Sequence, residues 1–111
     1  MSTQINQQIV NASGVKLFIE QDGREVARAF LYVLKNGLHA EPFGLLEDVF
    51  VEENLRGQGI GTELVKKIIE AAKKNHCYKL IATSRRERPK VHALYEQLGF
   101  KNYGMEFRME L

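Results

Sequence analysis

Three glycines alternate with other residues in the segment Arg56–Thr62, which reads RGQGIGT. A strand-type run, LLEDVFV over residues 45–51, precedes this segment, and a helical pattern over residues 60–74 follows it. The first turn of a helix leaves backbone N–H groups unpaired and carries the positive end of the macrodipole, and glycine lets an anion approach without meeting a Cβ atom. The segment therefore predicts a binding site for a phosphate-bearing ligand.

The spacing of these glycines argues against the two common nucleotide-binding loops. A P-loop requires Lys and then Ser or Thr after its last glycine, whereas Gly61 is followed directly by Thr62. A dinucleotide-binding loop requires G-x-G-x-x-G, whereas Gly57, Gly59 and Gly61 give G-x-G-x-G. A different class of phosphate-bearing ligand is therefore favoured.

A second block, VHALYEQLGF over residues 91–100, lies downstream of the glycine segment. Arg56, Gly59 and Gly61 fit the pattern Arg/Gln-x-x-Gly-x-Gly/Ala, and together with the second block this resembles the GNAT superfamily of N-acetyltransferases. The resemblance runs from about residue 45 to the C-terminus. The two motifs in order, separated by a helix and a strand, are more specific than either alone. The resemblance implies direct transfer of an acetyl group from acetyl-coenzyme A (acetyl-CoA) to a primary amine in a ternary complex.

The cofactor-binding residues follow from this resemblance. Backbone amides of the glycine segment are expected to hold the pyrophosphate of acetyl-CoA, and backbone groups of Val49 and Val51 to pair with the pantetheine arm as an added strand would. The expected set is Val49, Val51, Arg56, Gly57, Gln58, Gly59, Ile60, Gly61 and Thr62. No metal is expected, because the sequence shows no metal-ligand spacing.

Two adjacent carboxylates are candidates for the general base. An amine with a pKa near ~10.4 is mostly protonated at neutral pH and must lose a proton before it attacks. Glu47 and Asp48 lie on the strand leading to the glycine segment, where the family often places its base. Adjacent strand residues face opposite sides, so only one points into the site, although a β-bulge would reverse the alternation. Glu47 is preferred, and an exposed acid on the strand surface is the alternative for either residue.

Tyr95 occupies the position of the family's general acid in the sequence ALYEQLGF. Complete proton transfer from a tyrosine (pKa ~10) to a thiolate whose thiol has a pKa near ~8.5 is uphill by about 2 kcal/mol. A hydrogen bond to the developing thiolate is therefore favoured. An ordinary core tyrosine is the alternative. The Asn usually found before this tyrosine is missing, and His92, on the same helix face, either tunes Tyr95 or packs against it.

Charge and composition narrow the choice of partner and compartment. A net charge of +2 does not favour nucleic acid as a partner. A basic stretch is expected to face cofactor phosphates: Arg85, Arg86, Arg88 and Lys90. An acidic stretch is expected to face a cationic amine: Glu47, Asp48, Glu52 and Glu53. Solvated surface is the alternative for both. The chain shows no membrane-spanning run and no signal peptide, and its one cysteine, Cys77, fits a reducing compartment. A cytoplasmic location is expected.

The elements that position these residues are expected to form one domain over residues 1–111. Hydrophobic patterns predict helices over residues 60–74 and from Pro89 to Leu98, and strands over residues 15–20, 26–35, 44–52, 78–83 and 102–111. Residues 45–83 read as a βαβ unit, whose strands should be parallel. The fold class is therefore α/β, a GNAT-like, mixed but mostly antiparallel sheet with a central βαβ unit and two main helices.

One departure from the family concerns the acceptor side. GNAT proteins usually insert one or two helices between their first two strands, but Asp22-Gly23 predicts a tight hairpin that leaves no room for them. An open acceptor side suits a protein side chain or N-terminus, or a wall supplied by another subunit, and the acceptor amine is expected to belong to a small molecule or to a protein lysine or N-terminus. The predicted strand over residues 102–111 would have an exposed edge and could pair across a homodimer. The alternative function is a non-catalytic acyl-CoA-binding or interaction module with the same fold.

Overall fold

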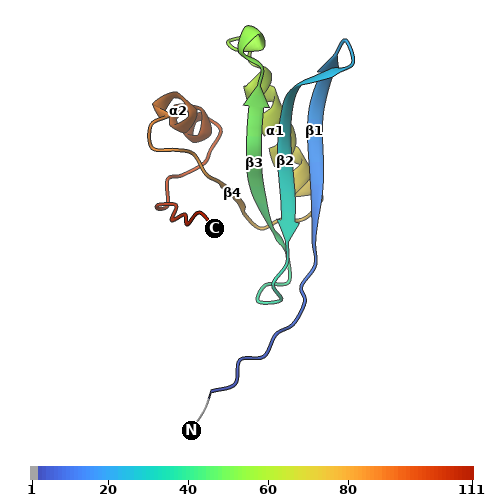
Figure 1. Ribbon diagram of the computed structural model, residues 1–111, viewed down its shortest axis with the longest axis vertical. Coiled ribbons are helices and arrows are strands. Elements are labelled where there is room, and N and C mark those ends of the chain that lie inside the picture. Colours follow the sequence, from blue (N-terminus) through green and yellow to red (C-terminus); the bar gives the residue numbers. More distant parts are fainter. Residues whose placement is uncertain (1–2) are drawn as a thin grey trace.

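The computed structural model describes residues 3–111, so residues 1 and 2 of the predicted domain lie outside the described part. The four strands form one sheet in the order β1-β2-β3-β4. Helix α1 lies against one face of this sheet and α2 lies beside β3 (Figure 1). The elements in chain order are β1 (Ala12–Gln21), β2 (Arg24–Leu34), β3 (Phe43–Val51), a 3-10 turn (Glu53–Leu55), α1 (Ile60–Lys74), β4 (Leu80–Ala82) and α2 (Pro89–Gln97).

A tight hairpin joins β1 to β2, as the sequence predicts. Its two turn residues, Asp22 and Gly23, have φ values of 54° and 73°. Positive φ at both central residues matches the right-handed twist of the paired strands. β1 and β2 pair antiparallel from end to end. The helices that GNAT proteins usually carry between these strands are therefore absent from the described chain, and the sheet face opposite α1 is left uncovered by helices.

The βαβ unit is confirmed. β2 and β3 are antiparallel, whereas β3 and β4 are parallel and are connected through α1. The sheet is thus mixed and mostly antiparallel, in agreement with the expected fold class. β4 is shorter than the predicted strand over residues 78–83, because its pairing with β3 runs only from Gly44↔Leu80 to Leu46↔Ala82. Beyond that point the two strands diverge.

The hydrophobic core lies between α1 and the sheet. The buried stripe of α1 follows helical spacing, with Leu64, Val65, Ile68 and Ala72 on one face. These side chains cluster with buried residues of the two central strands, namely Ala27, Ala29, Leu31 and Leu46. Burial of each large aliphatic side chain contributes about 1.5–3 kcal/mol, so α1 and the central strands form the stable part of the fold.

Helix α2 is attached more weakly, since none of its residues is fully buried. Pro89 stands at its first turn, and the chain leaves it through Gly99, whose φ is 101°. The amide of Gly99 donates to the carbonyl of Glu96 and that of Phe100 to the carbonyl of Tyr95, which together form a Schellman motif. Three partly buried side chains connect this region to the core: Tyr95, Leu98 and Phe100.

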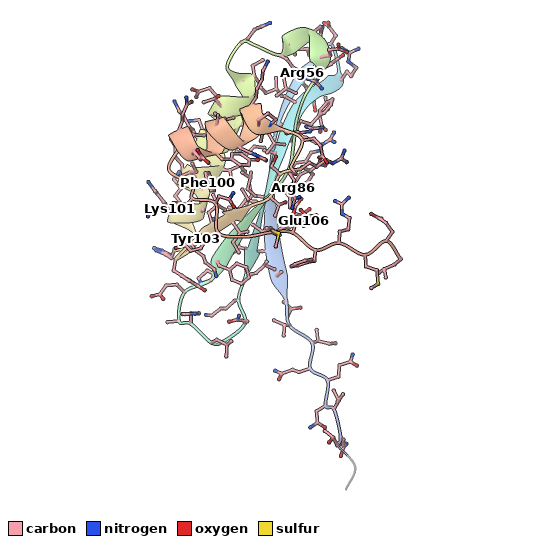
Figure 2. All side chains as sticks on the ribbon, turned by 90° about the vertical axis from the view of Figure 1, so that its left-hand side faces the viewer. Arg56, Arg86, Phe100, Lys101, Tyr103 and Glu106 are labelled. Carbon is pink, nitrogen blue, oxygen red and sulfur yellow. The ribbon has the colours of Figure 1, made fainter. Side chains whose placement is uncertain are left out.

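The strand predicted over residues 102–111 is wrong, because this segment has no regular secondary structure. Its alternating apolar side chains are at least 70% exposed: Tyr103, Met105, Phe107, Met109 and Leu111. Figure 2 shows the chain leaving the body of the protein after Tyr103 and Glu106. The alternation has the correct period for a strand, but a strand also needs a neighbour to pair its backbone. Within the described residues this segment has no such neighbour.

The segment over residues 3–11 projects from the body (Figure 1), and so does the end of the chain after Glu106 (Figure 2). The radius of gyration is accordingly 16.7 Å, compared with about 13 Å for a compact domain of similar length. Over residues 3–111, no helix combines the length and the apolar character needed to cross a bilayer.

Candidate active site

The glycine segment forms a turn that leads into α1. Gly57 and Gly59 have φ values of 82° and 81°, a left-handed conformation that glycine adopts without strain. Gly59 is the N-cap of α1, and its carbonyl accepts the amide of Glu63 at 3.0 Å. The amides of residues 60–62 precede this first helical bond, so they have no helical carbonyl to pair with. These are the amides that the predicted anion site would use.

Gly61 differs from the other two glycines of this segment. Its φ lies outside the left-handed region, and an added Cβ atom would lie 3.6 Å from Cγ2 of Val51, an ordinary contact. Neither the backbone conformation nor the packing therefore requires glycine at this position. The missing side chain favours a ligand that approaches the start of α1 closely.

A cleft of about 400 Å³ separates the glycine segment from α2. Its floor and one wall come from β3, the 3-10 turn and the start of α1, and the other wall comes from α2: Val51, Leu55, Arg56, Gly57, Gly59, Ile60, Gly61, Thr62, Lys90, Val91 and Leu94. The structure thus brings one predicted basic residue, Lys90, to the predicted anion site. Gln58 is exposed and does not line the cleft.

Two residues of the α2 wall were not predicted as part of the site. Val91 and Leu94 fit the apolar stripe of a core-facing helix, and this pattern gives no sign that part of the stripe faces a cleft. Leu94 is adjacent in sequence to Tyr95, which packs against the core. Leu94 borders the cleft and Tyr95 packs against the core only because α2 is placed next to the start of α1.

The edge of β3 is open next to this cleft. β4 pairs with β3 only as far as Leu46, so residues 47–51 have no strand on that side within the described chain. The side chains of Val49 and Val51 pack against the core, which leaves the backbone as the group that borders the opening. Arg56 donates from Nε to the carbonyl of Val51 at 2.9 Å and so ties the glycine segment to the strand.

Glu47 and Tyr95 come from different elements and lie close enough for the charge of Glu47 to act on the Tyr95 hydroxyl, although neither lines the cleft itself. Tyr95 is half-buried on α2, with its ring 5.3 Å from the Phe100 ring. Burial raises the pKa of the Tyr95 hydroxyl above its ordinary value, and the negative charge of Glu47 raises it further. At neutral pH the hydroxyl is therefore protonated and can donate a hydrogen bond. The sequence predicted both residues for the reaction, and the structure places them near each other.

Asp48 has a different environment from Glu47. It has a left-handed backbone, with φ of 50°, at a point where the register between β2 and β3 shifts. Both carboxylate oxygens accept hydrogen bonds from Arg28, from Nε at 3.1 Å and from Nη2 at 3.2 Å. The β-bulge considered above is therefore present, and the carboxylate of Asp48 is held by Arg28.

His92 lies on α2 but bonds to the preceding loop, since its Nε2 is 2.8 Å from the carbonyl oxygen of Arg85. It therefore anchors the basic stretch at the start of α2. Cys77 packs among partly buried core residues, and burial raises the pKa of its thiol, which lowers its reactivity. Among residues 3–111, no three His, Cys, Asp or Glu side chains gather in a way that could hold a metal ion.

Comparison with known proteins places the chain in a family. The sequence profile of the acetyltransferase (GNAT) family matches residues 2–100. The chain belongs to the GNAT family. Glucosamine 6-phosphate N-acetyltransferase of Trypanosoma brucei brucei is 34% identical over 98 residues, which cover 86% of this chain and 65% of that protein. The enzyme of the same name from Candida albicans is 32% identical over 99 residues, which cover 88% of this chain and 58% of that protein.

The fold of the GNAT family is also found by comparison with solved structures. The crystal structure of glucosamine-6-phosphate N-acetyltransferase from Arabidopsis thaliana superposes with a TM-score of 0.77 at 28% identity, covering 87% of this chain and 66% of that one. This GNAT chain therefore spans between about three fifths and two thirds of the length of these relatives.

Proposed function

We propose that this GNAT chain transfers the acetyl group of acetyl-CoA to the nitrogen of a primary amine by direct attack in a ternary complex. One observation carries the proposal: the cleft lies between the start of α1, β3 and α2, and the same two elements β3 and α2 also carry Glu47 and Tyr95. A phosphate-bearing thioester held in this cleft can present its acetyl group to both side chains. Domain boundaries at residues 1 and 111 and a cytoplasmic location stay predictions.

The residues of the cleft fit coenzyme A. In our proposal, the amides of residues 60–62 and the ammonium group of Lys90 bind the pyrophosphate, because both supply positive charge at the same end of the cleft. The open edge at residues 47–51 offers backbone groups to the pantetheine arm. Recognition through the backbone explains why Val49 and Val51 are ordinary core side chains.

Each reacting group then has a partner in the chain. Glu47 accepts a proton from the ammonium form of the acceptor, directly or through water. The free amine attacks the thioester carbonyl carbon, a C–N bond forms, the C–S bond breaks, and the second proton of the nitrogen passes through water to the departing thiolate. Tyr95 donates a hydrogen bond to the sulfur as it becomes a thiolate. Its raised pKa makes complete proton transfer to the thiolate less favourable, so hydrogen-bond donation is the role that we assign to it.

We propose a small amino sugar phosphate as the first class of acceptor to test, because the relatives described above carry glucosamine 6-phosphate in their names. The uncovered sheet face beside Glu47 agrees with this class. Phe30, the cross-strand partner of Glu47, stacks on Tyr32 with ring centroids 5.9 Å apart. Aromatic faces of this kind pack against the C–H surface of a sugar.

We expect Glu47→Gln to lower the rate of acetyl transfer near neutral pH and to shift the pH profile upward. Glutamine cannot accept the proton, so the reaction then depends on free amine, whose fraction rises toward the amine pKa of ~10.4. The measurement is kcat against pH, with glucosamine 6-phosphate, a polyamine and a lysine peptide as acceptors. Asp48→Asn is the matched variant, and a wild-type pH profile in both variants would place the base elsewhere.

The same assay tests the alternative function. Acetyl-CoA binding without acetylation of any amine would favour a non-catalytic acyl-CoA-binding or interaction module.

We further propose a homodimer in which residues 102–111 of one copy pair with the free edge of β4 in the other. The segment exposes an apolar set at strand spacing, and within the described chain β4 has a neighbour only on the β3 side.

Phe107→Gln should shift the protein toward the monomer in light scattering, since burial of one phenylalanine contributes about 2 kcal/mol. Arg108→Gln, its neighbour on the opposite strand face, should leave the mass unchanged. A wild-type monomer, or equal effects of both changes, would contradict this dimer.

A further inference from the structure

The β-bulge in β3 determines which residues of that strand face the core. Arg28 pairs with Phe50 and Phe30 pairs with Glu47, so two residues of β3, Asp48 and Val49, lie opposite the single residue Ala29. In a regular strand, residues an odd number of positions apart face opposite sides. The extra residue reverses this alternation. It is located between the proposed base and the proposed pantetheine-binding edge.

The contacts on either side show the effect of the bulge. Leu46 is buried in the core, and Val49 and Val51 pack against the same core although they are three and five positions further along. Without the bulge, these two valines would face the opposite side from Leu46. The bulge therefore allows Glu47 to stand on the open face of the sheet while the backbone of residues 49–51 borders the cleft.

The bulge strains the backbone of β3, and other contacts must offset this free-energy cost. Asp48 has a φ of 50°, and a non-glycine residue in this region is strained, although Asp tolerates it better than most. Arg28 holds the carboxylate with two hydrogen bonds, at 3.1 and 3.2 Å. Bidentate pairs of this kind fix direction as well as distance. The bond to Asp48 is the main reason why the pKa of Arg28 is raised.

Arg28 is itself held in place from two sides. Its Nη1 is 3.5 Å from Oε2 of Glu25, and its guanidinium carbon is 4.8 Å from the centre of the Phe50 ring. Glu25 lies on β2 and Phe50 lies two residues after Asp48 on β3. The guanidinium group thus spans the bulge and contacts both strands.

We propose that Arg28 is a positioning residue, which holds the bulge at Asp48 and thereby orients Glu47 and the backbone of residues 49–51 for the reaction. This inference rests on the proposed function, because it assigns Asp48 to the support of Glu47 and not to proton transfer. Arg28 touches no reacting atom. Its effect passes through the backbone of β3.

The test uses a glycine rescue. Arg28→Met retains the apolar stem but loses both hydrogen bonds, and we expect kcat to fall about fivefold and acetyl-CoA to bind about threefold more weakly. Asp48→Gly, added to Arg28→Met, should restore both values to within about twofold of wild type, because glycine adopts the left-handed conformation without a partner. Because Asp48→Gly also relieves backbone strain, thermal unfolding of each variant is measured alongside, and the kinetic changes are expected at temperatures where every variant is folded. Failure of the rescue would overturn the inference.

A control lies at the start of β2. Nη2 of Arg24 donates to both Oε1 and Oε2 of Glu52, the residue after β3, at 2.9 and 3.0 Å, and this pair lies outside the register shift between β2 and β3. Arg24→Met should leave kcat and acetyl-CoA affinity unchanged, and an effect equal to that of Arg28→Met would contradict a specific role for Arg28.

Hydrogen exchange separates this inference from the proposed function. Arg28→Met should accelerate exchange of the amides of residues 47–51, whereas exchange in α1 stays slow, and the added Asp48→Gly should reverse this acceleration. If the wild-type protein acetylates no amine, the proposed function fails, but this measurement still decides whether Arg28 fixes the bulge. Unchanged exchange in Arg28→Met would overturn the inference even in an active enzyme.

Discussion

Tyr95→Phe should reduce kcat by about 10²-fold while the KM for acetyl-CoA stays nearly unchanged. The substitution keeps the aromatic ring, so its contact with Phe100 and the attachment of α2 to the core are retained. It removes one hydroxyl group, whose hydrogen bond matters most when the sulfur of coenzyme A gains negative charge. Loss of such a donor typically costs on the order of 10²- to 10³-fold in rate. Steady-state kinetics at saturating acceptor would show a loss confined to kcat.

Tyr78→Phe provides a control for this experiment. Tyr78 is partly exposed, with its ring centroid 4.4 Å from that of His39, and it lies outside the residues that line the cleft. Removal of the Tyr78 hydroxyl group should leave kcat within about twofold of wild type, because most substitutions on the protein surface have small effects. If Tyr95→Phe kept the wild-type rate, Tyr95 would be an ordinary core tyrosine. The hydrogen-bond donor would then have to be sought in a bound water or in His92.

Gly59→Val should weaken the binding of acetyl-CoA at least tenfold, or by about 1.4 kcal/mol. Gly59 has a φ of 81°, and a β-branched residue in this conformation is strained. Relief of the strain would turn the N-cap of α1 and misalign the amides of residues 60–62, and the branched side chain would occupy space beside the pyrophosphate. Isothermal titration calorimetry with a folded variant measures the change.

Two further variants separate strain from ligand contact. Gly37→Val introduces the same strain in a surface turn, since Gly37 has a φ of 80° and does not line the cleft. It should lower stability without changing affinity. Gly61→Ala should stabilise α1, because glycine inside a helix costs roughly 0.5–1 kcal/mol relative to alanine, and yet should weaken acetyl-CoA binding. Unchanged affinity in both Gly59→Val and Gly61→Ala would remove the glycine segment from the cofactor site.

Much of the fold could be predicted because its signals are local. The buried stripe of α1, the hairpin at Asp22-Gly23 and the order of the elements are each encoded within a few neighbouring residues. The segment over residues 102–111 shows the limit of this reasoning. Its alternation is as regular as that of a real strand, but strand formation also depends on a partner edge that no local pattern specifies.

The candidate site could be predicted in part, for a related reason. The glycine segment and the block around Tyr95 have fixed spacings, so their residues were identified from the sequence. The contribution of Val91 and Leu94 to the cleft depends on how two helices are placed, and the pair Arg28–Asp48 depends on a register shift between strands 20 residues apart in sequence. Neither is visible as a pattern, because each arises only when distant elements pack together.

The weak attachment of α2 has a consequence for how the protein would respond to the proposed cofactor. α2 has no fully buried residue, whereas α1 and the central strands hold the core, so the two walls of the cleft differ in local stability. A ligand that bridges both walls binds only when α2 is docked. By mass action, such a ligand at 100 times its dissociation constant would favour the docked state by about 2.7 kcal/mol. Bound ligand would then hold α2 in place as the second wall of the cleft. The fraction of protein with α2 docked would therefore rise with the concentration of acetyl-CoA in the cell.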